Sequence, residues 1–265
     1  MTTGTAERQA AYRKQAAIGL GLAALITAAW GALHVYGVFF VDLGQMPWWA
    51  VLPMVLVQTW LYVGLFIVAH DCMHGSLVPF RPAINRAIGQ LCLALYAGFS
   101  FDALNRKHHR HHRHSGTADD PDFDDHPPAY GFWHWYGRFF TEYFGLREFV
   151  IIAAQSALYM FVLGADIANV LVFWALPALL SSAQLFVFGT WLPHRPGPDG
   201  FVDHHRARTN DNGWLVSLLT CFHFGYHHEH HLEPGAPWWR LPRVHRDLGQ
   251  QSLVKSPVNA APPAE

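Results

Sequence analysis

Long apolar runs dominate the hydrophobic pattern of the chain. Residues 16–41 and 48–69 contain no Asp, Glu, Lys or Arg. Each run exceeds the roughly 20 residues that a helix needs to cross a ~30 Å hydrocarbon core. We therefore predict two membrane-spanning helices. The first is expected to be an uncleaved anchor, because it is too long for a signal peptide and lacks a clear cleavage site.

A third apolar block covers residues 149–193 and is interrupted at Gly164, Ala165 and Asp166. This interruption predicts a second helical hairpin, whose first arm is short for a full crossing. Two weaker segments remain. Residues 84–101 are moderately apolar and are predicted to form a re-entrant or membrane-surface helix, and the aromatic residues 130–144 are typical of an interfacial helix.

The charges indicate how these helices are oriented. If the N-terminal segment 1–15 is cytoplasmic, all 18 Lys and Arg fall on one side, and the two outer turns carry only the acidic residues Asp42 and Asp166. Such a bias is typical of cytoplasmic loops. We predict an all-α integral membrane protein with four transmembrane helices in two hairpins, re-entrant or interfacial helices and a cytoplasmic histidine-rich cap. Residues 1–265 are expected to form one domain with both termini cytoplasmic and a disordered tail over 249–265.

Composition excludes several classes of protein. Of 265 residues, 51% are apolar and only 14% are Asp, Glu, Lys or Arg, against about 25% in a typical soluble domain. The net charge of −1 lacks the basic surplus of a nucleic-acid-binding protein. Three cysteines are too few for a disulfide framework. The unusual feature is histidine, because its 19 residues outnumber all Lys and Arg.

Nine histidines fall in patterns that suit metal binding. On a helix, positions i, i+3 and i+4 share a face, which groups one pair and two triplets, and a further histidine closes the fourth span. Nine imidazoles are too many for one tetrahedral zinc ion and suit two ions, although imidazole alone does not fix the metal. The candidate ligands are His70, His74, His108, His111, His112, His194, His227, His230 and His231.

Each cluster taken alone has a simpler interpretation. The pair at a helix end could satisfy carbonyls, and the basic run at 106–114 could bind lipid headgroups. The location of all clusters on one predicted face favours metal. Six neighbouring residues are candidates to bind metal or to orient the ligands, although the acidic ones could belong to a solvated loop: His223, Asp71, Asp119, Asp120, Asp122 and Glu229. His34, inside the first span, is expected to be a packed residue.

At these residues the chain resembles the membrane di-iron superfamily of fatty-acid desaturases, alkane hydroxylases and carotenoid oxygenases, which share HxxxH, HxxHH and HxxHH boxes. It resembles bacterial β-carotene 4-ketolases more closely, through HDCMHGSL from His70, WLPHR around His194 and FHFGYHHEHHLEP over 222–234. The resemblance implies two iron ions, O₂ as co-substrate, a carotenoid taken from the lipid bilayer, and two hydroxylations at C4 of a β-ionone ring that leave a ketone. It also implies a location in the bacterial inner membrane. Because no flavin, haem or iron–sulfur pattern is present, electrons would come from a ferredoxin-type partner.

The substrate remains open at this point. Trp60, Phe66, Trp133 and Phe139 are candidates to line its pocket, although aromatic residues near an interface are often membrane anchors. The boxes do not specify which C–H bond reacts, so a carotenoid hydroxylase, a fatty-acid desaturase and an alkane hydroxylase are alternatives. A zinc- or copper-binding membrane protein is an alternative of another class, although transporters place such ligands near the membrane midplane.

Overall fold

The computed structural model describes residues 3–124, 131–196 and 200–255. These residues form helices joined by turns and loops, and no strand is found among them; Thr209 and Tyr226 form an isolated bridge. The predicted all-helical class is confirmed for this part of the chain.

The first two apolar runs form a helical hairpin, as predicted. Helix α1 spans Thr3–Phe40 and α2 spans Trp48–Met73. The Asp42 carboxylate accepts hydrogen bonds from Gly44 N and Gln45 Nε2, at 2.9 and 2.8 Å, and so closes the turn between the helices. We call this end of the molecule the loop end.

The second hairpin breaks at the predicted residues. Its first arm consists of α6, Leu146–Ala157, and a π-helical turn, η1, Leu158–Val162. Gly164 then takes a φ of 73°, and Asp166 caps the next helix by accepting a hydrogen bond from Ala168 N at 2.7 Å. Asn169 donates to the carbonyl of Val41 at 2.7 Å, which joins the two hairpins at the loop end.

The returning arm is a continuous helical rod over Ile167–His194. It consists of α7 (Ile167–Val170), η2 (Leu171–Ala175), α8 (Leu176–Leu185), η3 (Phe186–Trp191) and α9 (Leu192–His194). The π-helical parts η2 and η3 precede Pro177 and Pro193. Each proline lacks an N–H, so the carbonyl four residues earlier loses its α-helical partner and the backbone widens locally.

Helices α3 (Pro82–Ala97) and α4 (Phe101–His114) form one bent unit. Their axes differ by 98°. The bend occurs at Gly98, which has a φ of 70°, and a Cβ there would lie 2.7 Å from Ile151 Cγ2. Glycine meets both demands, because it has no side chain and tolerates the left-handed region.

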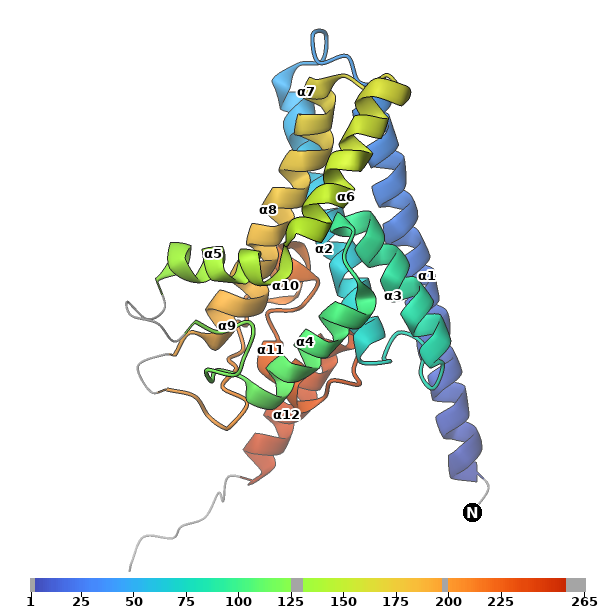
Figure 1. The fold of residues 1–265 in the computed structure, drawn as a ribbon. Helices are drawn as coiled ribbons and strands as arrows, with labels where there is room; N and C mark the ends of the chain where they lie inside the picture. Colours follow the sequence, from blue (N-terminus) through green and yellow to red (C-terminus); the bar gives the residue numbers. More distant parts are fainter. Residues whose placement is uncertain (1–2, 125–130, 197–199, 256–265) are drawn as a thin grey trace, which may run out of the picture.

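The remaining helices are short. They are α5 (Phe132–Tyr143), α10 (Trp214–Cys221), α11 (His227–Leu232), the 3₁₀ turn η4 (Trp238–Arg240) and α12 (Leu241–Lys255). Figure 1 shows α4, α9, α11 and α12 gathered at the end of the hairpins opposite the loop end, with α5 lying across the rod. We call this end the histidine end.

One expectation about the boundaries needs revision. Helix α12 continues to Lys255, so residues 249–255 are helical rather than part of a disordered tail; they contain good helix formers such as Gln250 and Gln251 and no proline. The rest of the predicted tail, 256–265, lies outside the described residues. Among the described residues, three helices are long and apolar enough to span a membrane, and up to five spans result if each bent pair, α3 with α4 and α5 with α6–η1, counts as one.

Candidate metal centre and adjoining cavity

The nine predicted histidines converge at the histidine end in two groups. We call His70, His74, His108, His112 and His230 the first histidine group, and His111, His194, His227 and His231 the second histidine group. Within each group, one ring nitrogen of every residue lies within 4.8 Å of the others. The two groups adjoin each other, because the rings of His112 and His231 stack at 4.2 Å.

Three helix ends supply most of these rings. His70 lies in the last turn of α2, and His74 is its C-cap. Helix α4 begins where the Ser100 hydroxyl accepts a hydrogen bond from Ala103 N at 3.4 Å. Its His108 and His112 join the first group, whereas His111 joins the second. One face of α4 therefore serves both groups.

Helix α11 divides its histidines in the same way, with His230 in the first group and His227 and His231 in the second. The opposite face of this helix is anchored by Glu229, which accepts hydrogen bonds from Thr209 Oγ1 at 2.7 Å and His245 Nδ1 at 2.6 Å. Glu229 therefore holds α11 in place and lies outside both groups.

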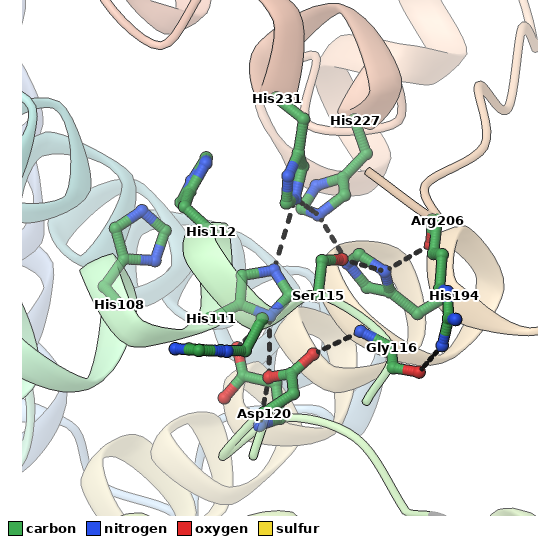
Figure 2. Close-up of polar contacts among 12 residues, drawn as sticks. His108, His111, His112, Ser115, Gly116, Asp120, His194, Arg206, His227 and His231 are labelled. Carbon is green, nitrogen blue, oxygen red and sulfur yellow. Dashed lines mark hydrogen bonds and ion pairs between the residues drawn. The ribbon is translucent and has the colours of Figure 1, made fainter. Parts of the chain in front are cut away.

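In the second group, two acceptors fix the ring tautomers. His111 Nδ1 donates to Asp120 Oδ1 at 2.9 Å, and His194 Nδ1 donates to the carbonyl of Arg206 at 2.8 Å (Figure 2). A neutral ring that donates from Nδ1 carries a lone pair on Nε2. The Nε2 lone pairs of His111 and His194 therefore point at His231 Nε2 and His227 Nε2, at 3.2 and 2.9 Å.

Neutral rings cannot satisfy all the contacts of this group. His227 Nε2 and His231 Nε2 also lie 3.1 Å from each other. If one of them donates to the other, the acceptor has no proton left for His111 or His194, and two lone pairs face each other. The Nδ1 atoms of His227 and His231 are buried without a partner among the described residues. A cation bound by all four Nε2 atoms resolves the conflict, so the donor set fits a metal ion.

The first group has the same character. His74 Nε2 lies 2.6 Å from His108 Nε2, and His230 Nε2 lies 3.0 Å from His112 Nε2. Both ring nitrogens of the buried His70 lack a hydrogen-bond partner within the described chain. An unpartnered buried nitrogen costs free energy, and coordination to a metal would remove that cost.

Burial keeps the α11 histidines in the form that binds metal. The pKa of His227, His230 and His231 lies well below the usual value, first because burial disfavours the charged ring and then because neighbouring histidines repel a proton. Neutral imidazole is the metal-binding form. These rings are therefore available to a metal at neutral pH without the loss of a proton.

The acidic loop contributes one carboxylate directly to the site. Burial alone would raise the pKa of Asp120, but His111 and the N–H groups of Gly116 and Asp122 hold it below its usual value. The two N–H···O distances are 2.8 and 2.9 Å. Asp120 thus remains charged and orients the ring of His111 through their hydrogen bond.

The other aspartate candidates differ in how deeply they are buried and in what they contact. Asp122 Oδ2 is 3.7 Å from His111 Nδ1, and burial raises its pKa to about 6. The buried Asp71 accepts a hydrogen bond from Trp238 N at 3.2 Å and lies 3.8 Å from His70 Nδ1. Asp119 pairs with Arg110 at the surface, at 3.4 Å, and contacts neither histidine group.

His223 and His34 do not join either group. His223 is buried between Trp214 and Trp238, with ring centroids 5.2 and 6.1 Å away. Its φ of 63° follows that of Phe222, 47°, and these two residues turn the chain from α10 into α11. His34 stacks on Trp30 in α1, which agrees with the expected packing role.

Two contacts in the candidate site cannot be predicted from the sequence, one made by His194 and one made by Asp122. The acceptor for His194 is the backbone carbonyl of Arg206, and every residue has such a carbonyl, so no side-chain signal could have revealed it. Tyr143, whose hydroxyl donates to Asp122, belongs to the aromatic residues 130–144, and that pattern predicts an interfacial helix but no contact with the acidic loop.

An apolar cavity of about 360 Å³ adjoins the two histidine groups. His70, His108, His111 and His227 line one end of it. The predicted Phe66 and Phe139 also line it, but Trp60 and Trp133 do not. Trp60 faces α10, where it stacks on Phe222 at 4.3 Å and donates to the carbonyl of Leu218, and Trp133 is 79% exposed on the outer face of α5.

Comparisons with known proteins identify the class to which this fold and site belong. Residues 46–161 and 146–256 match the family described as fatty acid desaturase. The chain belongs to the fatty acid desaturase family.

Individual relatives indicate a narrower group of proteins within this family. The chain is 53% identical to the beta-carotene ketolase of Paracoccus sp. strain PC1 over 234 residues, and this alignment covers 88% of this chain and 94% of the relative. It is 55% identical to the beta-carotene ketolase of Paracoccus sp. strain N81106 over 218 residues, and this alignment covers 82% of this chain and 88% of the relative. It is 37% identical to beta-carotene 4-ketolase 3 of Haematococcus lacustris over 91% of this chain and 83% of the relative. The resemblance predicted from the histidine boxes is confirmed.

Proposed function

We propose that the protein is a membrane di-iron oxygenase that forms a ketone at C4 of the β-ionone rings of β-carotene, giving echinenone and then canthaxanthin. The observation that carries the proposal is the convergence of two histidine groups on one end of an apolar cavity. Similarity to β-carotene ketolases over more than four fifths of the chain supports the same substrate.

Each histidine group would hold one iron ion. When bound there, iron would supply the activation of O₂, with two external electrons and two protons consumed for each hydroxylation. Two hydroxylations of one carbon give a geminal diol, and loss of water from that diol leaves the ketone. Asp120 contributes by keeping the tautomer of His111 fixed, so that its Nε2 remains a ligand throughout the reaction.

The cavity would position the substrate by shape alone. A β-ionone ring has no charge or hydrogen-bonding group, and the cavity offers it apolar side chains such as Phe66, Leu104 and Phe139. His70 and His108 of the first group and His111 and His227 of the second line the same end. A ring at that end would therefore have its C4 carbon facing both groups, and the surrounding apolar side chains would exclude water.

The membrane arrangement that agrees best with charge and geometry has four spans. Asp42 and Asp166 lie at the loop end, and all 18 Lys and Arg belong to the segments outside the two outer turns. The positive-inside rule then places the histidine end and both termini in the cytoplasm, with the protein in the inner membrane of a bacterium. Helix α5 would lie at the interface, and α3 with α4 would enter and leave from the cytoplasmic side.

The exposed face of α4 suits an acidic, ferredoxin-type electron donor. Arg106, Arg110 and Arg113 are exposed on the helix that carries His108, His111 and His112 on its inner face. Arg110 pairs with Asp119. A donor bound to this face would be separated from the metal ligands by the thickness of one helix. Complementary charge would also speed its encounter with the protein.

Expression in a bacterial host that accumulates β-carotene tests the proposed reaction. We expect echinenone and canthaxanthin from the wild-type chain and unchanged β-carotene from His112→Ala. Zeaxanthin as the product would instead show a carotenoid hydroxylase. Unchanged β-carotene together with oxidised fatty acids or alkanes would show a desaturase or an alkane hydroxylase. Zinc or copper in place of iron, without turnover, would favour the metal-handling alternative.

A further inference from the structure

The cavity extends far beyond the histidine groups. Its lining continues along one face of the rod, from Thr190 near the histidine end through Ser182 and Ala178 to Leu171 near the loop end. Leu171 and Thr190 are 19 residues apart, which corresponds to at most roughly 28 Å at the α-helical rise of ~1.5 Å per residue, because η2 and η3 are π-helical and rise less. The cavity is therefore a groove about as long as the hydrocarbon core of a bilayer is thick, ~30 Å.

Small side chains make this face of the rod concave. Ala175, Ala178, Ser182 and Gly189 follow one another at intervals of three, four and seven residues and all line the groove. Residues at such intervals share one helix face. Leu176 and Leu180 are exposed on the rod but do not line the groove.

Helix α6 covers the groove without filling it. Near the histidine end it is held by Arg147, whose Nη1 donates to the Gly98 carbonyl at 2.8 Å, and by the contact of Ile151 with Gly98. Near the loop end, Tyr159 packs on Trp174 with ring centroids 5.0 Å apart. Between these contacts Ile152 and Ser156 line the groove, and no residue of α6 is buried. The groove is thus open to lipid beside α6.

Toward the loop end, the groove is lined by an aromatic wall that lies one helical turn before Leu171. Trp174 lines the groove and is only 4% exposed. Its ring is held by Tyr159 and by the edge-on ring of His34, whose centroid is 6.0 Å away. A ring that lies against this wall would be 16 residues from Thr190, or at most roughly 24 Å along the rod.

We propose that the groove binds the whole carotenoid across the membrane, with the reacting ring at the histidine groups and the second ring against Trp174. This inference rests on the proposed function, because it assigns a second subsite to the same substrate. A polyene with a ring at each end matches the length and apolar lining of the groove. The open side beside α6 gives it a path from the bilayer.

The second ring site has a consequence for the order of products. After the first ketone forms, the other ring can react only if the molecule leaves, turns end for end and binds again. The new 4-keto ring must then occupy the site at Trp174. Echinenone is therefore a released intermediate, and substitutions near Trp174 can change the ratio of echinenone to canthaxanthin while the groups around the metal stay intact.

A series of shortened substrates tests the proposal. Purified, iron-loaded protein, with O₂ and a small chemical reductant, is supplied with polyenes that keep one β-ionone ring and are progressively shortened at the far end. Ala175→Phe and Ala178→Phe each place a large ring in the groove, and Leu180→Phe places the same ring on the lipid-facing side. We expect the two alanine variants to lose more than tenfold of their activity on β-carotene while converting short polyenes at the wild-type rate. Leu180→Phe should convert both.

The variants Ala175→Phe and Ala178→Phe should also differ in the length of the longest substrate that they accept. Ala178 is three residues nearer to the histidine groups than Ala175, so the longest substrate accepted should be shorter by roughly 4.5 Å in Ala178→Phe than in Ala175→Phe. Iron content and the rate on the shortest polyene report whether each variant is folded. If a phenylalanine variant loses iron, Ala175→Leu and Ala178→Leu repeat the comparison with less added volume.

Two results would overturn the inference. Full activity of iron-loaded Ala175→Phe and Ala178→Phe on β-carotene would show that the polyene lies outside the groove. Equal loss on long and short substrates with iron retained would show that these positions act at the reacting ring. Neither result affects the proposed reaction, which fails only if the wild-type protein forms no 4-keto product.

Discussion

Asp120→Asn tests how the acidic loop supports the metal centre. The Asp120 carboxylate accepts three hydrogen bonds, from His111 Nδ1 at 2.9 Å, Gly116 N at 2.8 Å and Asp122 N at 2.9 Å. Asparagine has nearly the same shape but one acceptor oxygen and no charge. Its amide nitrogen must therefore face either the His111 side or Gly116, where a donor meets a donor.

The expected size of the effect follows from these contacts. Loss of one such bond behind a ligand histidine typically reduces metal affinity or activity 10–100-fold, which corresponds to about 1.4–2.7 kcal/mol. We expect Asp120→Asn to lose iron from the second histidine group at 10–100-fold lower chelator concentration than the wild-type protein, with a parallel loss of ketone formation.

The assay is iron content after dialysis against graded concentrations of chelator, measured together with turnover of β-carotene. Asp119→Asn is the matched control, because Asp119 is exposed, is adjacent in sequence and pairs with Arg110 at 3.4 Å rather than with a histidine of either group. It should behave like the wild-type protein. If Asp120→Asn retained iron and activity as Asp119→Asn does, the assignment of Asp120 as the residue that orients His111 would be refuted.

Three further predictions concern the ligands, the fold and the electron donor. His111→Ala and His231→Ala should each abolish ketone formation and lower iron content, whereas His34→Ala should keep its iron, as elemental analysis of the purified variants would show. Gly98→Ala should cost about 1–2 kcal/mol of stability, because the φ of Gly98 is 70°. Gly21→Ala is the control: a Cβ added at Gly21 would have no atom within 4 Å, so this variant should not lower the thermal midpoint in detergent. Arg106→Glu should slow reduction of the protein by an acidic ferredoxin, most strongly at low salt, whereas Arg243→Glu should be reduced at the wild-type rate. Both variants should be normal with a small chemical reductant. If ferredoxin reduced Arg106→Glu as fast as the wild-type protein, this face would be excluded as the binding site of the donor.

The apolar pattern predicts the helices well and their arrangement less well. The hairpin turns at residues 41–47 and at Gly164–Asp166 could be predicted because charged or turn-forming residues interrupt long apolar runs. The 98° bend between α3 and α4 could not be predicted. It depends on the contact between Gly98 and Ile151, which are distant in sequence.

The histidine spacing predicts which rings share a helix face but does not predict how they are divided between the two groups. His108, His111 and His112 lie on one face of α4, yet His111 belongs to the second group because it meets His194 and His231 from other elements. That division depends on the tertiary arrangement of α9 and α11. The spacing rule contains no information about it.

Substrate contacts were the least predictable part of the site. Helix α2 is apolar on all sides, so its sequence does not distinguish Trp60, which faces α10, from Phe66, which lines the groove. The groove along the rod depends on small residues such as Ala178 opposite α6. Alanine in an apolar helix carries no signal of its own, and its meaning appears only when the neighbouring helix is in place.

The position of the metal ions tests the central claim most directly. A diffraction experiment on the active protein at the iron absorption edge should show two anomalous peaks per chain, one among His70, His74, His108, His112 and His230 and one among His111, His194, His227 and His231. The account predicts these two peaks at comparable height. A single peak, or peaks that appear only at the zinc or copper edge, would contradict it.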